Sequence, residues 1–197
     1  MSARGRASSS TSTSRNSTGS REVQAGASAT VASITTAPSP TGDGLRRRTV
    51  GYEYVHVAVD DYSRLAYAEV LADEKASTAA AFLARAVTFY RRHGITVERV
   101  LTDNGGAYRG VLHAIACRAL GIRHLRTRPY RPQTNGKAER FIRTLLNGWA
   151  YAAIYRSSQE RTLALDGWLW HYNHRRRHTA LSHQPPISRT NLLGSYT

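Results

Sequence analysis

The chain has 197 residues, 41% of them hydrophobic, and its 28 Lys and Arg outnumber its 13 Asp and Glu to give a formal net charge of +15. This length suits one domain with a hydrophobic core and a tail. The single cysteine, Cys117, excludes a disulfide framework within the chain and a cysteine-based zinc site, and no apolar run has the length of a membrane span, so we expect an intracellular protein with no membrane partner.

Residues 1–48 form a Ser-, Thr-, Ala- and Arg-rich tail with almost no large apolar side chains. Such a segment buries too little surface to offset the entropy of ordering, so we predict that it is disordered. Apolar and polar side chains alternate in residues 29–36 as they do in a β-strand, but the Ser and Thr content makes a strand there a weak prediction. The globular part is expected to begin near residue 49.

Strand and helix patterns alternate after residue 51. β-Branched and aromatic residues predict strands at 52–60 and 65–71, which a short turn joins into a hairpin. The apolar spacing of Leu83, Val87 and Tyr90 predicts a helix over 77–92 with Gly94 as its C-cap. A strand, a helix, a strand and two helices then follow, at 97–102, 109–120, 122–126, 136 onward and 159–176. This order is typical of an α/β fold.

Two carboxylates stand out along this pattern. Val100-Leu-Thr-Asp103-Asn-Gly-Gly is a short apolar strand that ends in an acid and glycines. Ligands of open α/β sheets bind beyond the carboxyl ends of strands, which makes Asp103 a candidate site residue. Cys117, in the apolar helix that follows, is predicted to be a core residue.

The second carboxylate, Glu139, lies in a basic, turn-rich entry into a helix, Arg128-Pro-Tyr-Arg-Pro-Gln-Thr-Asn-Gly-Lys-Ala-Glu139-Arg-Phe-Ile-Arg143. Apolar residues from Ala138 to Trp149 recur at helical spacing and predict one buried stripe, so that Glu139 faces away from the core. An isolated acid of this kind is more often solvated or ion-paired. Two carboxylates together supply the hard oxygen ligands of a magnesium site for phosphate chemistry.

Thr-Asp103-Asn-Gly, 35 intervening residues, and Glu139 within Pro-Tyr-x-Pro-Gln-Thr-Asn-Gly-Lys-Ala-Glu-Arg resemble the integrase core of insertion-sequence transposases and retroviral integrases. The resemblance runs from about residue 51 to about residue 189. It implies a ribonuclease-H-like α/β core over 49–158 and a basic helical extension over 159–197. It also implies a cytoplasmic, nucleoid-associated bacterial enzyme of DNA integration or transposition.

The resemblance further implies two Mg²⁺ or Mn²⁺ ions, with Asp103 and Glu139 as two of three catalytic metal ligands. Its partners would be the DNA of transposon ends and target, bound by a homo-oligomer. Charge and proximity add candidate DNA-binding residues: Asn104, Arg128, Arg131, Gln133, Asn135, Lys137, Arg140 and Arg143.

Positive charge is concentrated in the C-terminal part, where residues 121–197 hold thirteen basic and three acidic side chains. A basic surface of this kind suits a polyanion. The run of arginines from Arg175 to Arg177 is either a phosphate-contacting patch or a solvated helix end. For Trp149, Trp168 and Trp170, packing in the core is favoured over stacking on bases.

In the family that the chain resembles, the first catalytic Asp lies on a central strand before the hairpin, and no strand of that type precedes Gly51. We therefore expect a ribonuclease-H-like core whose first central strand is missing, with little or no strand transfer. Asp60 and Asp61 are more simply explained as a turn, or as partners of Arg64, than as substitute ligands. A non-catalytic DNA-binding remnant and a ribonuclease-H-like nuclease remain alternatives.

We predict that a reading-frame error is the reason why this strand is missing. Related transposases carry a segment like Glu-Leu-Val-His-Val-Asp-Val-Lys-Lys-Leu at the missing position. Written in GC-rich codons and read one base later, that peptide becomes the Ser/Thr-rich sequence of residues 8–17. This match favours a frameshifted segment over a natural linker.

Overall fold

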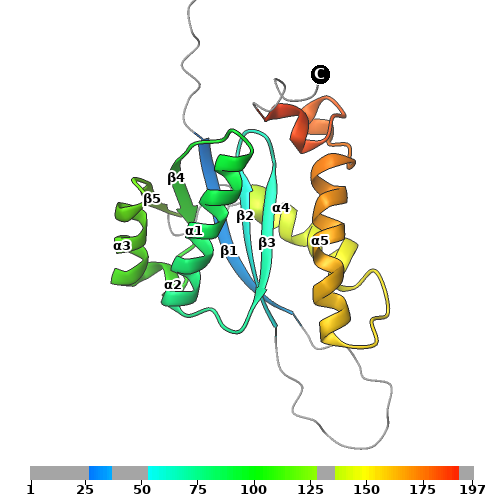
Figure 1. The fold of residues 1–197 in the computed structure, drawn as a ribbon, viewed down its shortest axis with the longest axis horizontal. Coiled ribbons are helices and arrows are strands. Elements are labelled where there is room, and N and C mark those ends of the chain that lie inside the picture. Colours follow the sequence, from blue (N-terminus) through cyan, green and yellow to red (C-terminus); the bar gives the residue numbers. More distant parts are fainter. Residues whose placement is uncertain (1–26, 37–52, 128–135, 191–197) are drawn as a thin grey trace, which may run out of the picture.

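A five-stranded sheet forms the centre of the chain (Figure 1). The computed structural model describes residues 27–36, 53–127 and 136–190. Its strands are β1 Ala27–Thr36, β2 Glu53–Asp60, β3 Ala66–Leu71, β4 Val97–Thr102 and β5 Arg123–Arg126, and they lie in the order β3-β2-β1-β4-β5. β1 pairs antiparallel with β2 and parallel with β4, so the sheet is mixed. An α/β class and the predicted hairpin are confirmed.

The central position of the sheet is filled by β1, and the expectation of a missing central strand is therefore wrong. Within the predicted tail, Ala27–Thr36 pairs along its length with β2, from Ala29 opposite Asp60 to Thr36 opposite Glu53. Val31 and Ala32 are buried, one on each face. The side chains of this segment indicate only weak strand propensity. The strand is stable because it has a neighbour on each side and so gains two ladders of backbone hydrogen bonds. The rest of residues 1–48 lies outside the described ranges.

Two layers of helices cover the sheet. The first face carries α1 Ala76–Arg92, α2 Gly106–Arg109 and α3 Val111–Ala119, and its core includes Phe82, Leu83 and Tyr90. The second face carries α4 Gly136–Leu145, a π-helical turn η2 Leu146–Ala150 and α5 Ser158–His174, with Phe141, Leu145 and Trp149 in its core. Short 3-10 turns at Thr179–Leu181 and Pro186–Arg189 follow α5. No helix in these described ranges is long and apolar enough to cross a bilayer.

The predicted apolar stripes are largely confirmed. Gly94 adopts a positive φ of 71° just past α1, as a helix-terminating glycine does. The α4 stripe continues into the π-helical turn, where the Trp149 indole N–H donates to the Arg161 carbonyl at 2.7 Å. Trp149 is buried and Trp168 packs against the same core, whereas Trp170 is 52% exposed, so the core prediction is wrong for Trp170.

α5 is attached to the sheet by polar contacts that the sequence did not predict. The Arg161 guanidinium, with 2% of its side chain exposed, donates through Nη2 to Glu53 Oε2 on β2 at 2.5 Å. Near the other end of the helix, the Asn173 side chain donates to the Ala66 carbonyl at 2.8 Å and accepts from the Ala66 N–H at 2.9 Å. These contacts fix the C-terminal helix against β2 and the edge strand β3.

Replacing Glu53 with Gln tests the buried ion pair. Removal of one charge leaves the Arg161 guanidinium buried without this carboxylate, and the free energy of unfolding should fall by about 3 kcal/mol. Urea denaturation followed by circular dichroism measures the change. Glu98→Gln, on an exposed position of β4, is the matched control and should alter the free energy of unfolding by less than about 0.5 kcal/mol. Equal losses of unfolding free energy in the two variants would contradict a stabilising role for the Glu53–Arg161 ion pair.

Candidate active site and basic surface

Asp103 lies directly after β4, at the carboxyl end of this strand, as predicted. Val31 of β1 is the register partner of Thr102, so the middle of the central strand runs beside the strand end that carries the acid. The Asp103 Oδ1 accepts the Gly105 N–H at 2.8 Å, and a Cβ on Gly105 would lie 2.9 Å from that oxygen. A side chain at position 105 would therefore displace the Asp103 carboxylate from this hydrogen bond.

Asn104, a predicted DNA contact, takes part in the fold itself. Its exposed side chain donates through Nδ2 to the Thr127 carbonyl at 3.1 Å. The Thr127 N–H in turn donates to the Thr102 carbonyl at 3.0 Å. These bonds extend the β4–β5 pairing beyond the strand ends, and they leave the Asn104 side-chain oxygen for another donor.

Glu139 lies in the first turn of α4 and is exposed, next to buried Ala138. A carboxylate at this end of a helix is stabilised by the helix dipole. Arg140 and Arg143 are exposed on the same helix. Lys137 is instead engaged by the protein, because its Nζ lies 2.5 Å from Asp61 Oδ1. The other predicted DNA-binding residues, Arg128, Arg131, Gln133 and Asn135, lie outside the described residues.

The described residues do not provide a third carboxylate for a two-ion site. β1 contains no Asp or Glu between Ala27 and Thr36. Within residues 27–36, 53–127 and 136–190, the only group of three or more His, Cys, Asp or Glu with converging ligand atoms consists of two histidines and a cysteine. The oxygen donors present therefore do not fit a site that holds two magnesium ions.

Asp60 and Asp61 make contacts that stabilise the turn after β2. Asp60 is 2% exposed, and its Oδ2 accepts the Ser63 N–H at 2.7 Å and the Ser63 hydroxyl at 2.6 Å. Asp61 lies 3.5 Å from Arg64 and also pairs with Lys137. The interpretation of these two acids as a turn and an Arg64 partner is confirmed, although Asp60 Oδ1 is a buried oxygen without a hydrogen-bond partner.

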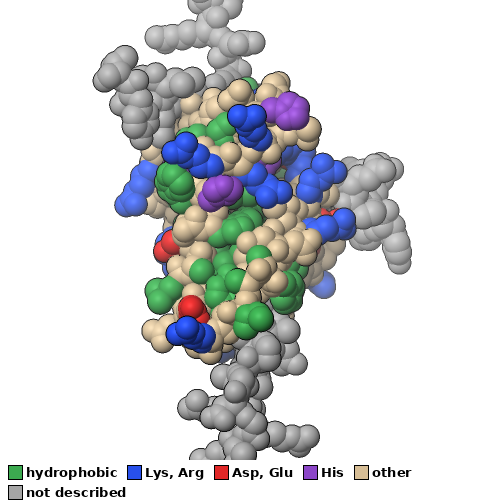
Figure 2. Space-filling view, turned by 90° about the vertical axis from the view of Figure 1, so that its right-hand side faces the viewer, with side chains coloured by type: hydrophobic (Ala, Val, Ile, Leu, Met, Phe, Trp, Pro, Cys, Tyr) green, Lys and Arg blue, Asp and Glu red, His purple; other side chains and the backbone are tan. Residues whose placement is uncertain are grey.

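A basic surface lies around the C-terminal end of α5. Figure 2 shows Lys and Arg side chains gathered over the upper part of this face, above a band of hydrophobic side chains. Arg175, Arg176 and Arg177 are exposed there, and the Arg175 guanidinium lies 5.6 Å from the centre of the exposed Trp170 ring. Burial, with Arg176 and Arg64 nearby, lowers the pKa of His178, so this histidine adds little charge at neutral pH.

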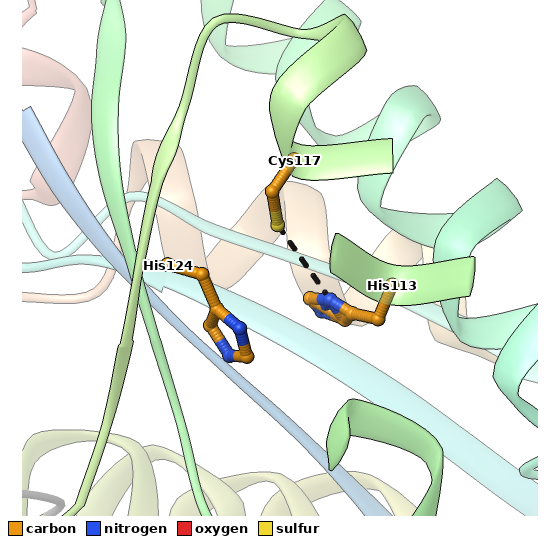
Figure 3. A group of neighbouring side chains, drawn as sticks. All are labelled: His113, Cys117 and His124. Atoms are coloured by element: carbon orange, nitrogen blue, oxygen red, sulfur yellow. Dashed lines mark hydrogen bonds between the residues drawn. The ribbon is translucent and has the colours of Figure 1, made fainter. Parts of the chain in front are cut away.

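His113, Cys117 and His124 form a largely buried cluster that was not predicted from the sequence (Figure 3). Cys117 is a core residue, as predicted, but the two histidines converge on it. The signal available was the spacing of His113 and Cys117, which places them on one helix face four residues apart. Burial, with His124 beside it, lowers the pKa of His113 to about 4, so its ring is neutral at physiological pH.

Two family models described as an integrase core domain match the chain, one over residues 34–132 and one over residues 120–186. The first spans half of the 197 residues. A Pol-related polyprotein of a mouse intracisternal A-particle is 36% identical over 94 residues, which are 47% of this chain and 10% of that protein. An uncharacterized protein of insertion element IS136 from Agrobacterium fabrum is 31% identical over 86 residues, 44% of each chain. The chain thus spans less than half the length of these relatives.

Solved structures share the fold at lower sequence identity. A simian T-cell lymphotropic virus intasome, in complex with the regulatory subunit B56 gamma of PP2A, matches 86% of this chain and 54% of that chain, with a TM-score of 0.64 and 23% identity. The catalytic core domain of BIV integrase matches 82% and 91%, with a TM-score of 0.58 and 22% identity. The HTLV-2 integrase catalytic core, solved in complex with magnesium, has a TM-score of 0.58 and 17% identity over 82% of this chain and 93% of that one.

Proposed function

Because the chain belongs to the integrase core domain family, we propose that it is a DNA integration or transposition core that binds DNA but does not join strands. The observation that carries this proposal is the absence of an acidic residue on the described central strand, Ala27–Thr36. The family depends on divalent metal, and Asp103 and Glu139 would be two of its oxygen ligands. Two ligands on separate elements hold such an ion weakly.

DNA binding is the part of the function that this chain retains under the proposal. The exposed Arg140 and Arg143 lie on the helix that carries Glu139, and the exposed arginines after α5 extend the positive surface. Guanidinium groups pair with phosphate oxygens independently of sequence, so the affinity should fall steeply with salt. An intasome and a trimeric form among the structural neighbours support assembly of several copies on transposon ends and target DNA.

The absence of the acid follows from the frameshift that residues 8–17 suggest. Under this proposal the frame recovers before Gly51, and β1 is an out-of-frame segment that occupies the place of the original strand. The nucleotide sequence of the coding region, translated in all frames, tests it. A neighbouring frame that reads His-Val-Asp-Val-Lys across codons 8–17 is the expected result, and a coding region with no such frame would show that the Ser/Thr-rich tail is genuine.

Strand transfer tests the incomplete site. The chain should join no detectable product from a 3′-recessed DNA end with Mg²⁺ or Mn²⁺, because a two-metal reaction needs its third carboxylate. Ala32, one residue past the register partner of Thr102 and on the face covered by α4, is the position at which an acid would approach Asp103. Ala32→Asp should therefore gain Mn²⁺-dependent cleavage or joining.

Ser33→Asp is the matched control. The Ser33 hydroxyl donates a hydrogen bond to Glu74, so an acid at this position would lie away from the face that α4 covers. It should stay inactive. Ala32 is 3% exposed, so its carboxylate should destabilise the chain until metal binds, and Mn²⁺ should raise the melting temperature of Ala32→Asp but not of Ser33→Asp. Robust joining by the unsubstituted chain would overturn the proposal of an incomplete site.

DNA binding can be tested apart from chemistry with paired arginine substitutions. Arg176→Ala with Arg177→Ala should weaken binding to duplexes of any sequence and reduce the salt slope by about two, because each arginine neutralises one phosphate. Fluorescence anisotropy over a salt series measures this. Arg91→Ala with Arg92→Ala, an exposed pair at the end of α1 on the other face of the sheet, is the control. An equal loss of affinity in the two double variants would place the DNA elsewhere.

A further inference from the structure

Three potential metal ligands, buried His113 and Cys117 and half-buried His124, lie close together. His113 and Cys117 project from one face of α3 toward His124 on β5 (Figure 3). One potential ligand atom from each residue lies within 4.8 Å of the other two. The site lies on the face of the sheet that α1 and α3 cover, whereas Glu139 belongs to a helix on the opposite face.

A hydrogen bond to Thr102 orients the His124 ring. The Thr102 hydroxyl has one proton, which it donates to the Asp103 carbonyl at 3.0 Å. With that proton so used, His124 Nε2, 2.8 Å from the same oxygen, donates its N–H in the tautomer that carries the proton on Nε2. The proton on Nε2 leaves a lone pair on Nδ1. Metal-binding histidines are commonly oriented in this way, by a hydrogen bond from the second ring nitrogen.

His113 offers one ring nitrogen to Cys117 and has a second ring nitrogen that is buried without a partner. The residue is fully buried, and its Nε2 is a buried nitrogen without a hydrogen-bond partner. Its Nδ1 lies 3.6 Å from Cys117 Sγ, a contact that fits a thiol donating to a neutral imidazole. Buried polar atoms without partners are uncommon and destabilising. The Nδ1 lone pair that faces the thiol is the one available to a metal once the thiol has lost its proton.

The donor types determine which metal fits. Two imidazoles and one thiolate suit a borderline-soft cation such as Zn²⁺, whereas Mg²⁺ and Mn²⁺ prefer carboxylate and water oxygens. The expectation that a single cysteine excludes a cysteine-based zinc site is therefore too broad, because one thiolate can bind zinc together with two imidazoles. We propose that His113, Cys117 and His124 bind one Zn²⁺, with water as the fourth ligand. On binding, the Cys117 thiol releases its proton to solvent and its sulfur binds the metal as a thiolate.

A modest side-chain movement completes the site. The His113 and His124 rings are stacked, with their centroids 4.6 Å apart and their planes at 19°. Ligand atoms around a tetrahedral zinc are about 3.3–3.6 Å apart, so the rings must turn out of the stack as the cluster contracts. The metal would then link α3 to β5 and, through His124 and Thr102, stabilise the strand end that presents Asp103.

Titration of the full chain with Co²⁺ tests the proposal directly. Co²⁺ should bind one per chain with a tetrahedral visible spectrum and a thiolate-to-metal absorption band, and Zn²⁺ should displace it. Because one thiol proton is released, Zn²⁺ affinity should rise about tenfold per pH unit between about pH 6 and pH 8. An unsubstituted chain that gives no thiolate-to-metal band overturns the proposal without any variant.

Variants then assign the ligands. Cys117→Ser should abolish the thiolate band, and His124→Ala should weaken Co²⁺ binding at least about tenfold. His171→Ala, an exposed histidine on α5, should leave binding unchanged. Zn²⁺ at a hundredfold excess over its Kd should raise the melting temperature of the unsubstituted chain by about 5 °C. An equal rise in Cys117→Ser would place the metal elsewhere.

Discussion

The fold depends on the central position of its sheet being filled. A strand there must satisfy the backbone groups of β2 on one side and of β4 on the other, and without it both would present unpaired N–H and C=O groups in the interior. β1 meets this requirement with Ala, Ser and Thr around Val31 and Ile34. Its ladders belong to the backbone and are open to many sequences, which is why a segment with weak strand character can occupy the position.

Because many sequences can form the β1 ladders, the sheet can be complete whether or not the side chains of a metal site are present. Pairing with β1 brings the middle of the central strand beside Asp103 whatever side chains it carries, since the register is a property of the backbone ladder. A metal site is far less tolerant, because each ligand must be a particular side chain. The described central strand, Ala27–Thr36, thus completes the sheet without carrying a carboxylate, and the fold alone does not establish activity.

The local elements are predictable from the sequence because their patterns are strong and short in range. Spacing alone predicts the helix apolar stripe that ends in Trp149 and the β4 strand followed by Asp103. It does not predict the central strand, since the stability of that strand comes from two partners distant in sequence. Arg161 and Asn173 escape prediction for a related reason: a buried polar residue on a helix identifies its partner only after the helix has been placed against the sheet.

The two candidate metal sites would bind a cation for different physical reasons. Asp103 and Glu139 are accessible to water, so an ion there competes with hydration and depends on a third charged ligand and on substrate phosphate. His113, Cys117 and His124 are neutral and largely buried, and a soft cation gains its stability from the nitrogen and sulfur ligands themselves. Thr102 connects these environments, because its hydroxyl bonds to His124 and to the backbone carbonyl of Asp103. Order at the strand end that carries the acid can therefore be set from the far face of the sheet.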